Sequence, residues 1–206
     1  MTKSQYRLKL PDMSDIKSNF TDNEWNYIAI APISAACAVV FADNVLTNPL
    51  SAIKEMKGLK DVLKKVSAEY PSNKLIQDTF KILDDAKTLE DLNRTADRMN
   101  EDVEKNAPEL KKYFENDSIE KIFEETFEKE GFLKTFSAVF AIIPMLAGKI
   151  AESKKMEGTE EFKQAIYKVA YETANAAKEG WFGFGDPISK DEARFLDKLK
   201  KFLEIA

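Results

Sequence analysis

Apolar residues recur at helical spacing along most of this chain. In the stretch 89–103, for example, they are separated by alternating steps of three and four, which places them on one face of a helix. Two capping-box sequences, Thr21 with Glu24 and Ser189 with Glu192, mark helix starts. No run of alternating apolar and polar residues is long enough to predict a strand. The pattern therefore predicts an all-α fold of about seven to nine helices.

Two of the predicted helices are apolar on nearly every side, so we expect them to be buried at the centre of the molecule. The first runs from Trp25 to Ala42 without a charged residue, and the second occupies 132–152. Each has an interior proline, Pro32 or Pro144, which cannot donate a backbone hydrogen bond. At Pro32 the helix either kinks or begins late, after a short first turn. Aligning the two prolines superposes small residues, so a degenerate internal repeat is one interpretation.

These elements fit a single multi-helix, bundle-like domain at 21–206, built around the two proline-interrupted apolar central helices. Residues 1–20 show no period and predict a loose N-terminal arm. Turn and capping residues predict further boundaries inside the domain. These are a helix break at Gly58, a cap at Ser72 and another cap at Thr159.

Composition and charge narrow the partners and the compartment. The 206 residues are 44% hydrophobic and 33% charged, an ordinary balance for a folded protein, and the formal net charge is −5. Phosphate binding needs a concentrated positive surface, so we expect no nucleic acid partner. The five lysines between 54 and 65 are interpreted as a solvated helix face. A single cysteine and a polar N-terminus without a secretory signal predict a cytoplasmic protein.

The chain contains no histidine, which removes several kinds of catalytic and metal site at once. Ser-His and Cys-His nucleophiles, zinc sites with a histidine ligand and Glu-x-x-His di-iron sites are all excluded. Cys37 lies among alanines and is expected to act as a small buried hydrophobe. We therefore assign no catalytic residue, no metal ligand and no cofactor. A non-enzymatic role is favoured, although the question of enzymatic activity stays open.

The candidate binding site is the segment 180–188, Gly-Trp-Phe-Gly-Phe-Gly-Asp-Pro-Ile. One interpretation is a helix stop followed by a turn that tucks its aromatic side chains against the bundle. The other is a ligand- or partner-binding loop, because three aromatic residues are many for one short loop. Its candidate residues are Trp181, Phe182, Phe184 and Asp186. The acidic residues nearby do not have the spacing of a calcium loop and are interpreted as surface caps.

Two segments carry a resemblance to known proteins. Residues 24–43 contain Glu-Trp, Ala-Pro and an alanine-rich run ending in Ala-Asp, and residues 176–192 contain Ala-Ala-Lys-Glu-Gly, Gly-Phe-Gly and Ser-x-x-Glu. Together they resemble a group of small all-helical prokaryotic proteins to which no activity is attached. The second segment is also similar in part to the Asp-Gly-x-Ile-Ser-x-x-Glu stretch of TerB-like helical domains of tellurite resistance. Because Pro187 precedes Ile188 and the Asp-Gly pair is absent, the resemblance implies no metal site here.

Three functions are compatible with these observations. The leading hypothesis is a non-enzymatic cytoplasmic binding or protein-interaction domain, with self-association as one form of it. The first alternative is a small-molecule carrier or carboxylate-dependent enzyme, with a pocket between the central helices near Pro32 and Pro144. The second is a protein that inserts into membranes conditionally. No stable membrane span is expected, because the 18 uncharged residues of the first apolar helix rise only about 27 Å.

Overall fold

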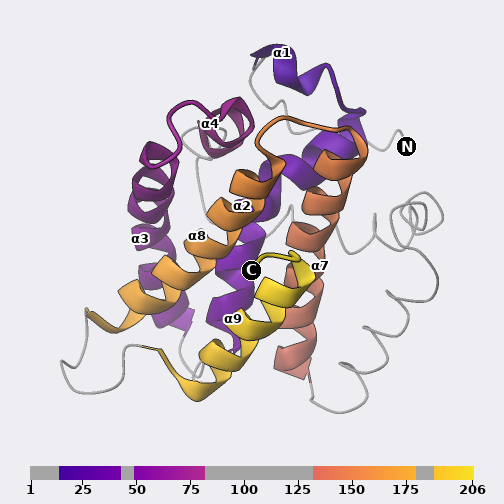
Figure 1. Cartoon of the computed structure of the whole chain (residues 1–206). Coiled ribbons are helices and arrows are strands. Elements are labelled where there is room, and N and C mark those ends of the chain that lie inside the picture. Colours follow the sequence, from indigo (N-terminus) through magenta and orange to yellow (C-terminus); the bar gives the residue numbers. More distant parts are fainter. Residues whose placement is uncertain (1–13, 43–48, 82–131, 180–187) are drawn as a thin grey trace, which may run out of the picture.

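A computed structural model of the chain describes residues 14–42, 49–81, 132–179 and 188–206 (Figure 1). These residues form helices and contain no strand, which confirms the all-α prediction for the described part. The helices are α1 (Ser14–Lys17), α2 (Asp22–Ala42), α3 (Pro49–Ala68), α4 (Lys74–Lys81), α7 (Phe132–Ser153), α8 (Thr159–Glu179) and α9 (Lys190–Phe202).

The two apolar helices, α2 and α7, lie side by side at the centre and run in opposite directions (Figure 1). At one end the Glu24 carboxylate, near the start of α2, is 3.0 Å from the Lys154 ammonium just after α7. At the other end the rings of Phe41 and Phe140 stack with their centroids 5.7 Å apart. Many buried residues of this pair are alanines, whose small side chains let two helix backbones approach closely.

Both prolines lie inside continuous helices. α2 begins at Asp22 and passes through Pro32, so the interpretation of a late helix start is wrong. α7 passes through Pro144 in the same way. A proline in a helix interior costs about 3 kcal/mol, since it removes a donor and crowds the preceding turn. Burial of apolar side chains such as Ile28 and Leu146, both fully buried, offsets that cost.

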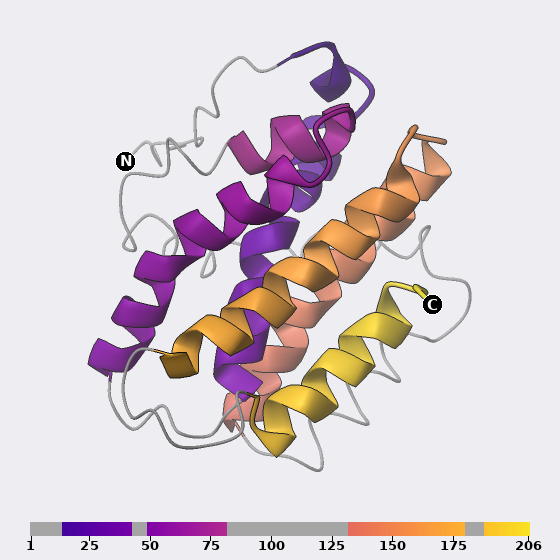
Figure 2. The ribbon, with the colours of Figure 1, turned by 60° about the vertical axis from the view of Figure 1, so that its left-hand side comes forward.

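A second layer covers the central pair. Figure 2 shows α3, α8 and α9 side by side, with α2 and α7 behind them. α8 is the middle helix of this layer: it packs mainly on α2 and contacts α3 on one flank and α9 on the other. The inward face of α8 is buried, and it includes Phe162, Ile166, Val169, Ala170 and Thr173.

The packing of the outer helices does not follow an internal repeat. α8 comes after α7 in the chain but packs mainly on α2. In a true repeat α3, which follows α2, would pack on α7 in the same way. Instead α3 packs mainly on α8. Among the described helices, any likeness between the two halves is therefore confined to the central pair.

Both capping boxes form as the sequence predicts. The Thr21 hydroxyl accepts a hydrogen bond from the Glu24 amide at 3.3 Å, and the Glu24 carboxylate accepts one from the Thr21 amide at 2.9 Å. Phe20 and Trp25 flank this box with ring centroids 5.8 Å apart, as a hydrophobic staple should. At α9 the reciprocal bonds between Ser189 and Glu192 are 2.7 and 3.1 Å long. These starts are local, so the sequence was sufficient to predict them.

The core includes apolar residues that precede position 21. α1 is a single helical turn within the segment expected to be a loose arm. Ile16 in this turn and Phe20 just after it are both buried against the rest of the core.

Three predicted boundaries are wrong. Gly58 lies inside the continuous helix α3, where a glycine costs only about 1 kcal/mol. Asn73, not Ser72, caps α4, because its side-chain oxygen accepts a hydrogen bond from the Ile76 amide at 3.1 Å. Thr159 is the first residue of α8, and its hydroxyl donates to the Met156 carbonyl instead of capping the helix.

Asn73 joins two distant parts of the chain. Its side-chain amide donates to the Gly158 carbonyl at 2.9 Å and to the Glu161 carboxylate at 2.8 Å. Gly158 has a positive φ of 77° and is the residue before α8. One side chain therefore caps α4 and holds the start of α8 against it.

Candidate functional site

The binding residues predicted from the sequence, Trp181, Phe182, Phe184 and Asp186, lie outside the described residues. The described chain stops at Glu179, the last residue of α8, and continues at Ile188, just before the cap of α9. The aromatic segment therefore joins the two helices that form one edge of the outer layer. The surface of those two helices is the place to look for a site.

A pair of tyrosines lies on the outer side of α8. Tyr171 is 41% exposed, and it is the one large hydrophobic residue that is exposed within the described parts of the chain. Its ring stacks on that of Tyr167, one helical turn earlier, with centroids 6.4 Å apart and 25° between the planes. Tyrosine combines a large apolar face with a polar tip, which suits a surface that is covered by a partner.

α9 completes the surface beside these rings. Burial raises the pKa of Tyr167, and the nearby Asp197 carboxylate and Tyr171 raise it further, so the phenol stays protonated at neutral pH. Asp197 and Ala193 lie one turn apart on α9, and both are exposed. We call Tyr167, Tyr171, Ala193 and Asp197 the α8–α9 face.

A line of basic residues borders this face. It consists of Lys190, Arg194, Lys198 and Lys201, which follow one another on α9 at steps of four, four and three. All four are exposed. Arg194 lies 3.6 Å from the Asp191 carboxylate, whereas the three lysines have no ion-pair partner among the described residues. We call these four residues the basic ridge.

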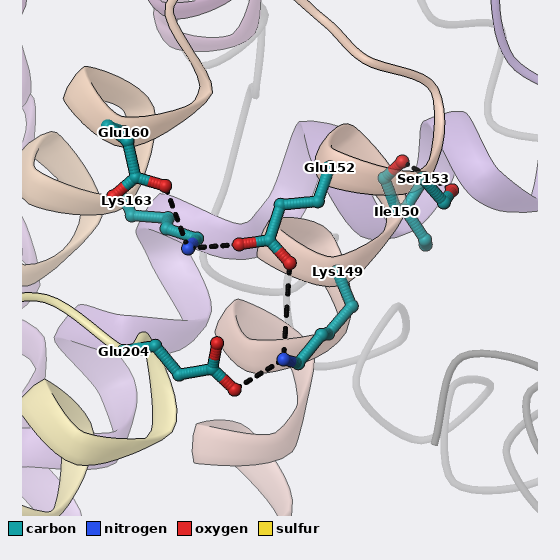
Figure 3. A network of polar contacts seen from close by, with 7 residues as sticks. All are labelled: Lys149, Ile150, Glu152, Ser153, Glu160, Lys163 and Glu204. Carbon is teal, nitrogen blue, oxygen red and sulfur yellow. Dashed lines mark hydrogen bonds and ion pairs between the residues drawn. The ribbon is translucent and has the colours of Figure 1, made fainter. Parts of the chain in front are cut away.

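A second polar cluster lies at the other end of α8 (Figure 3). The Lys163 ammonium is almost completely buried and pairs with the carboxylates of Glu152 from α7 and Glu160 from α8, the latter at 3.1 Å. Lys149 bridges Glu152 and Glu204, a residue that follows α9. The cluster therefore ties α7, α8 and the segment after α9 together.

A glycine makes room for the buried lysine. A Cβ atom at Gly148 would lie 3.4 Å from two carbons of the Lys163 side chain, so the lysine stem runs across the position where another residue would project. Gly148 is four residues before Glu152, one turn away on the same face of α7. The backbone of α7 thus supports the lysine stem while Glu152 binds its ammonium.

The electrostatics of this cluster indicate a structural role. Burial lowers the pKa of Lys163, but its hydrogen bonds and charge pairing with Glu152 and Glu160 outweigh that effect, and the net pKa is raised. A nucleophilic or general-base lysine needs the opposite shift. Lys149 likewise holds the pKa of Glu204 below its ordinary value, which keeps this carboxylate ionised. The cluster is therefore a set of permanently charged pairs that holds helices together.

Cys37 offers no reactive thiol. Burial raises the pKa of this thiol to about 12, well above its ordinary value. Cys37 packs against the core as a small hydrophobe, but it is half-buried and not fully buried as the sequence predicted.

We expect Cys37 to react slowly with iodoacetamide at pH 8 in the folded protein. Because burial holds the thiol pKa well above pH 8, the reactive thiolate should be about 100-fold or more scarcer in the folded chain than in the chain unfolded by urea. The alkylation rate, followed by mass, should fall in the same proportion. As the chain has one cysteine, the urea-unfolded protein is its own control, and similar rates in both states would contradict the raised pKa of the thiol.

Metal binding and membrane contact are two further possibilities for the described residues. No group of three or more Cys, Asp and Glu side chains gathers there in a way that could hold a metal ion. By length and composition, α2 could cross a membrane, but 78% of its most apolar 18-residue stretch is buried inside the molecule. In the folded state, this helix therefore uses its apolar surface for core packing.

Comparison of the chain with models of known protein families, with curated proteins and with solved structures finds no match. The functional assignment therefore depends on the residues described above. Sequence reasoning missed the tyrosine pair and the basic ridge. The tyrosine pair could be seen in the sequence, because Tyr167 and Tyr171 are four residues apart and lie outside the apolar stripe of α8 that faces inward. However, helical spacing alone does not show which outer face lacks a neighbour.

Proposed function

We propose that this chain is a non-enzymatic protein-interaction domain whose partner binds the α8–α9 face. The observation that carries the proposal is the stacked pair of Tyr167 and exposed Tyr171 on the outer layer. Tyrosines are enriched among the residues that dominate binding energy at protein interfaces, whereas the exposed surfaces of helices are usually charged. The aromatic residues of 180–188 follow α8 directly in the sequence and lie outside the described residues.

The chemistry of the described residues supports a binding role over a catalytic one. The buried Lys163 is held as an ammonium by two carboxylates, and the thiol of Cys37 is kept protonated by burial. Neither group is poised for nucleophilic or acid–base catalysis. The carrier hypothesis and the membrane-insertion hypothesis remain predictions, and no residue in the described parts of the chain favours either of them.

Replacing Tyr171 with alanine is expected to weaken partner binding about tenfold or more. The side chain is exposed and alanine is a good helix former, so the fold should be unaffected. The measurement is native mass spectrometry of the chain purified gently from its own host. The wild type should retain a partner or a second copy of itself, and the variant should lose it.

The control is Asn26→Ala, which truncates an exposed side chain on α2 and should leave the complex intact. Circular dichroism of all three proteins checks that helix content is equal. A wild type that is a bare monomer, or a complex that survives Tyr171→Ala unchanged, would contradict the proposed function.

A further inference from the structure

α9 is held to the bundle along a single buried stripe. The helix lies at the edge of the outer layer and contacts α2, α7 and α8 (Figure 2). Its buried apolar residues are Phe195, Leu196 and Leu199, with Leu203 at its end, and its outer side is the exposed basic ridge. A 13-residue helix is marginal in water by itself, so α9 depends on this docking. We call residues 190–206 the α9 unit.

An ion pair holds the end of this unit. Glu204 follows the last turn of α9, and its carboxylate binds the Lys149 ammonium of α7 (Figure 3). The φ of Glu204 is 55°, a left-handed conformation that at this position usually belongs to glycine. A residue with a Cβ atom is disfavoured in this conformation. The ion pair therefore holds the segment after α9 in a turn that its own backbone does not favour.

The ion pairs of the cluster in Figure 3 differ in their exposure to water. The Lys163 side chain is 4% exposed, and its pair with Glu152 joins α8 to α7 where dissolved salt has little effect. The side chains of Lys149 and Glu204 are 30% and 57% exposed, so dissolved ions screen their attraction. Lys149 also lies 3.9 Å from the Glu152 carboxylate, which keeps it partnered when Glu204 moves away. The link to the α9 unit can thus break while α7 and α8 stay joined.

From this asymmetry we infer that the α9 unit opens and closes on the bundle separately, and that the ion pair of Lys149 with Glu204 sets how much of it is closed. Opening removes Ala193 and Asp197 from beside the tyrosine pair, because both belong to α9. The consequence for binding rests on the proposed function: a partner that covers the α8–α9 face binds only the closed form. The ion pair is then a salt-sensitive control of that face.

The test is hydrogen exchange of the full chain, followed by mass spectrometry of peptides from 190–206 and from 162–174 in α8. Exchange through local opening reports the population of the open form. In the wild type, the amides of the α9 unit should exchange before those of α8. Glu204→Gln removes the charge and keeps the size of the side chain. It should speed exchange of the α9 unit about two- to fivefold, the range for an exposed ion pair, and leave α8 unchanged.

Salt provides an independent comparison. Raising it from about 50 to 500 mM should speed exchange of the α9 unit in the wild type, whereas the Glu204→Gln protein should respond much less. The matched control is Glu157→Gln, the same change at an exposed carboxylate between α7 and α8 that has no ion-pair partner among the described residues. This control should leave the exchange of both peptides unchanged.

The outcomes separate this inference from the proposed function. An α9 unit that exchanges together with α8, or at a rate that Glu204→Gln leaves unchanged, overturns the inference. Equal acceleration in every helix also overturns it, because the ion pair would then stabilise the whole fold. If the inference falls while Tyr171→Ala still loses a partner, the proposed function stands. If the α9 unit opens as expected but the wild type retains no partner, the inference stands and the proposed function falls.

Discussion

Replacing Trp25 with alanine is expected to lower the free energy of unfolding by about 3–5 kcal/mol, the range for deleting a large buried aromatic side chain. Trp25 is 1% exposed and is among the largest fully buried side chains in the described parts of the chain. It packs on Phe20 beside the capping box that starts α2. The loss therefore combines a cavity in the core with a weakened start of the central helix.

The measurement is urea unfolding followed by circular dichroism at 222 nm. Trp25→Phe serves as the control, because it keeps an aromatic ring against Phe20 and should cost well under half as much. If Trp25→Ala cost no more than an ordinary surface substitution, within about 0.5 kcal/mol, the hydrophobic staple would not be part of the core.

Gly158→Ala is expected to cost about 2–4 kcal/mol, the second large effect. The φ of Gly158 is 77°, and the left-handed region costs a residue with a Cβ atom about 1–2 kcal/mol. The new Cβ atom would also lie 2.1 Å from the Asn73 side-chain nitrogen, so Asn73 must move. Moving it disturbs the cap of α4, a kind of contact worth about 1 kcal/mol, and the bond to Glu161.

Gly58→Ala is the matched control and should change stability in the opposite direction. Nothing lies within 4 Å of a Cβ atom at Gly58, which is in the interior of α3, so alanine should add about 0.5–1 kcal/mol. A double-mutant cycle sharpens the test: in an Asn73→Ala background the clash is removed, and Gly158→Ala should cost less. Equal costs in both backgrounds would show that the two residues do not interact.

The helical class and two helix starts were predictable because their causes are local. Thr21 and Glu24, like Ser189 and Glu192, satisfy each other's backbone amides within a single turn. The burial of residues 25–42 of α2 followed from the lack of charge in that stretch. The cap of α4 was misplaced by one residue: Asn73 makes it, and the same side chain also binds Gly158, which is far away in the sequence.

The proposed binding surface could be predicted only in part. Aromatic residues near the end of α8 stood out in the sequence, but the tyrosine pair and the basic ridge became a surface only when α8 and α9 were placed side by side. The cluster of Lys163 with Glu152 and Glu160 was equally hidden. In a chain with 36 acidic residues, no spacing distinguishes the carboxylates that will hold a buried lysine.

The sequence by itself determined that this protein is helical, where its two capping boxes lie and which helices are buried, because periodicity and caps act over a few residues. Only the tertiary structure decided that α8 crosses to α2, that Gly148 makes room for Lys163 and that Tyr171 stays exposed. Those outcomes depend on which helices become neighbours. A helix carries the same pattern of residues whether or not a neighbour covers its outer face, so exposure and pairing are properties of the assembled bundle.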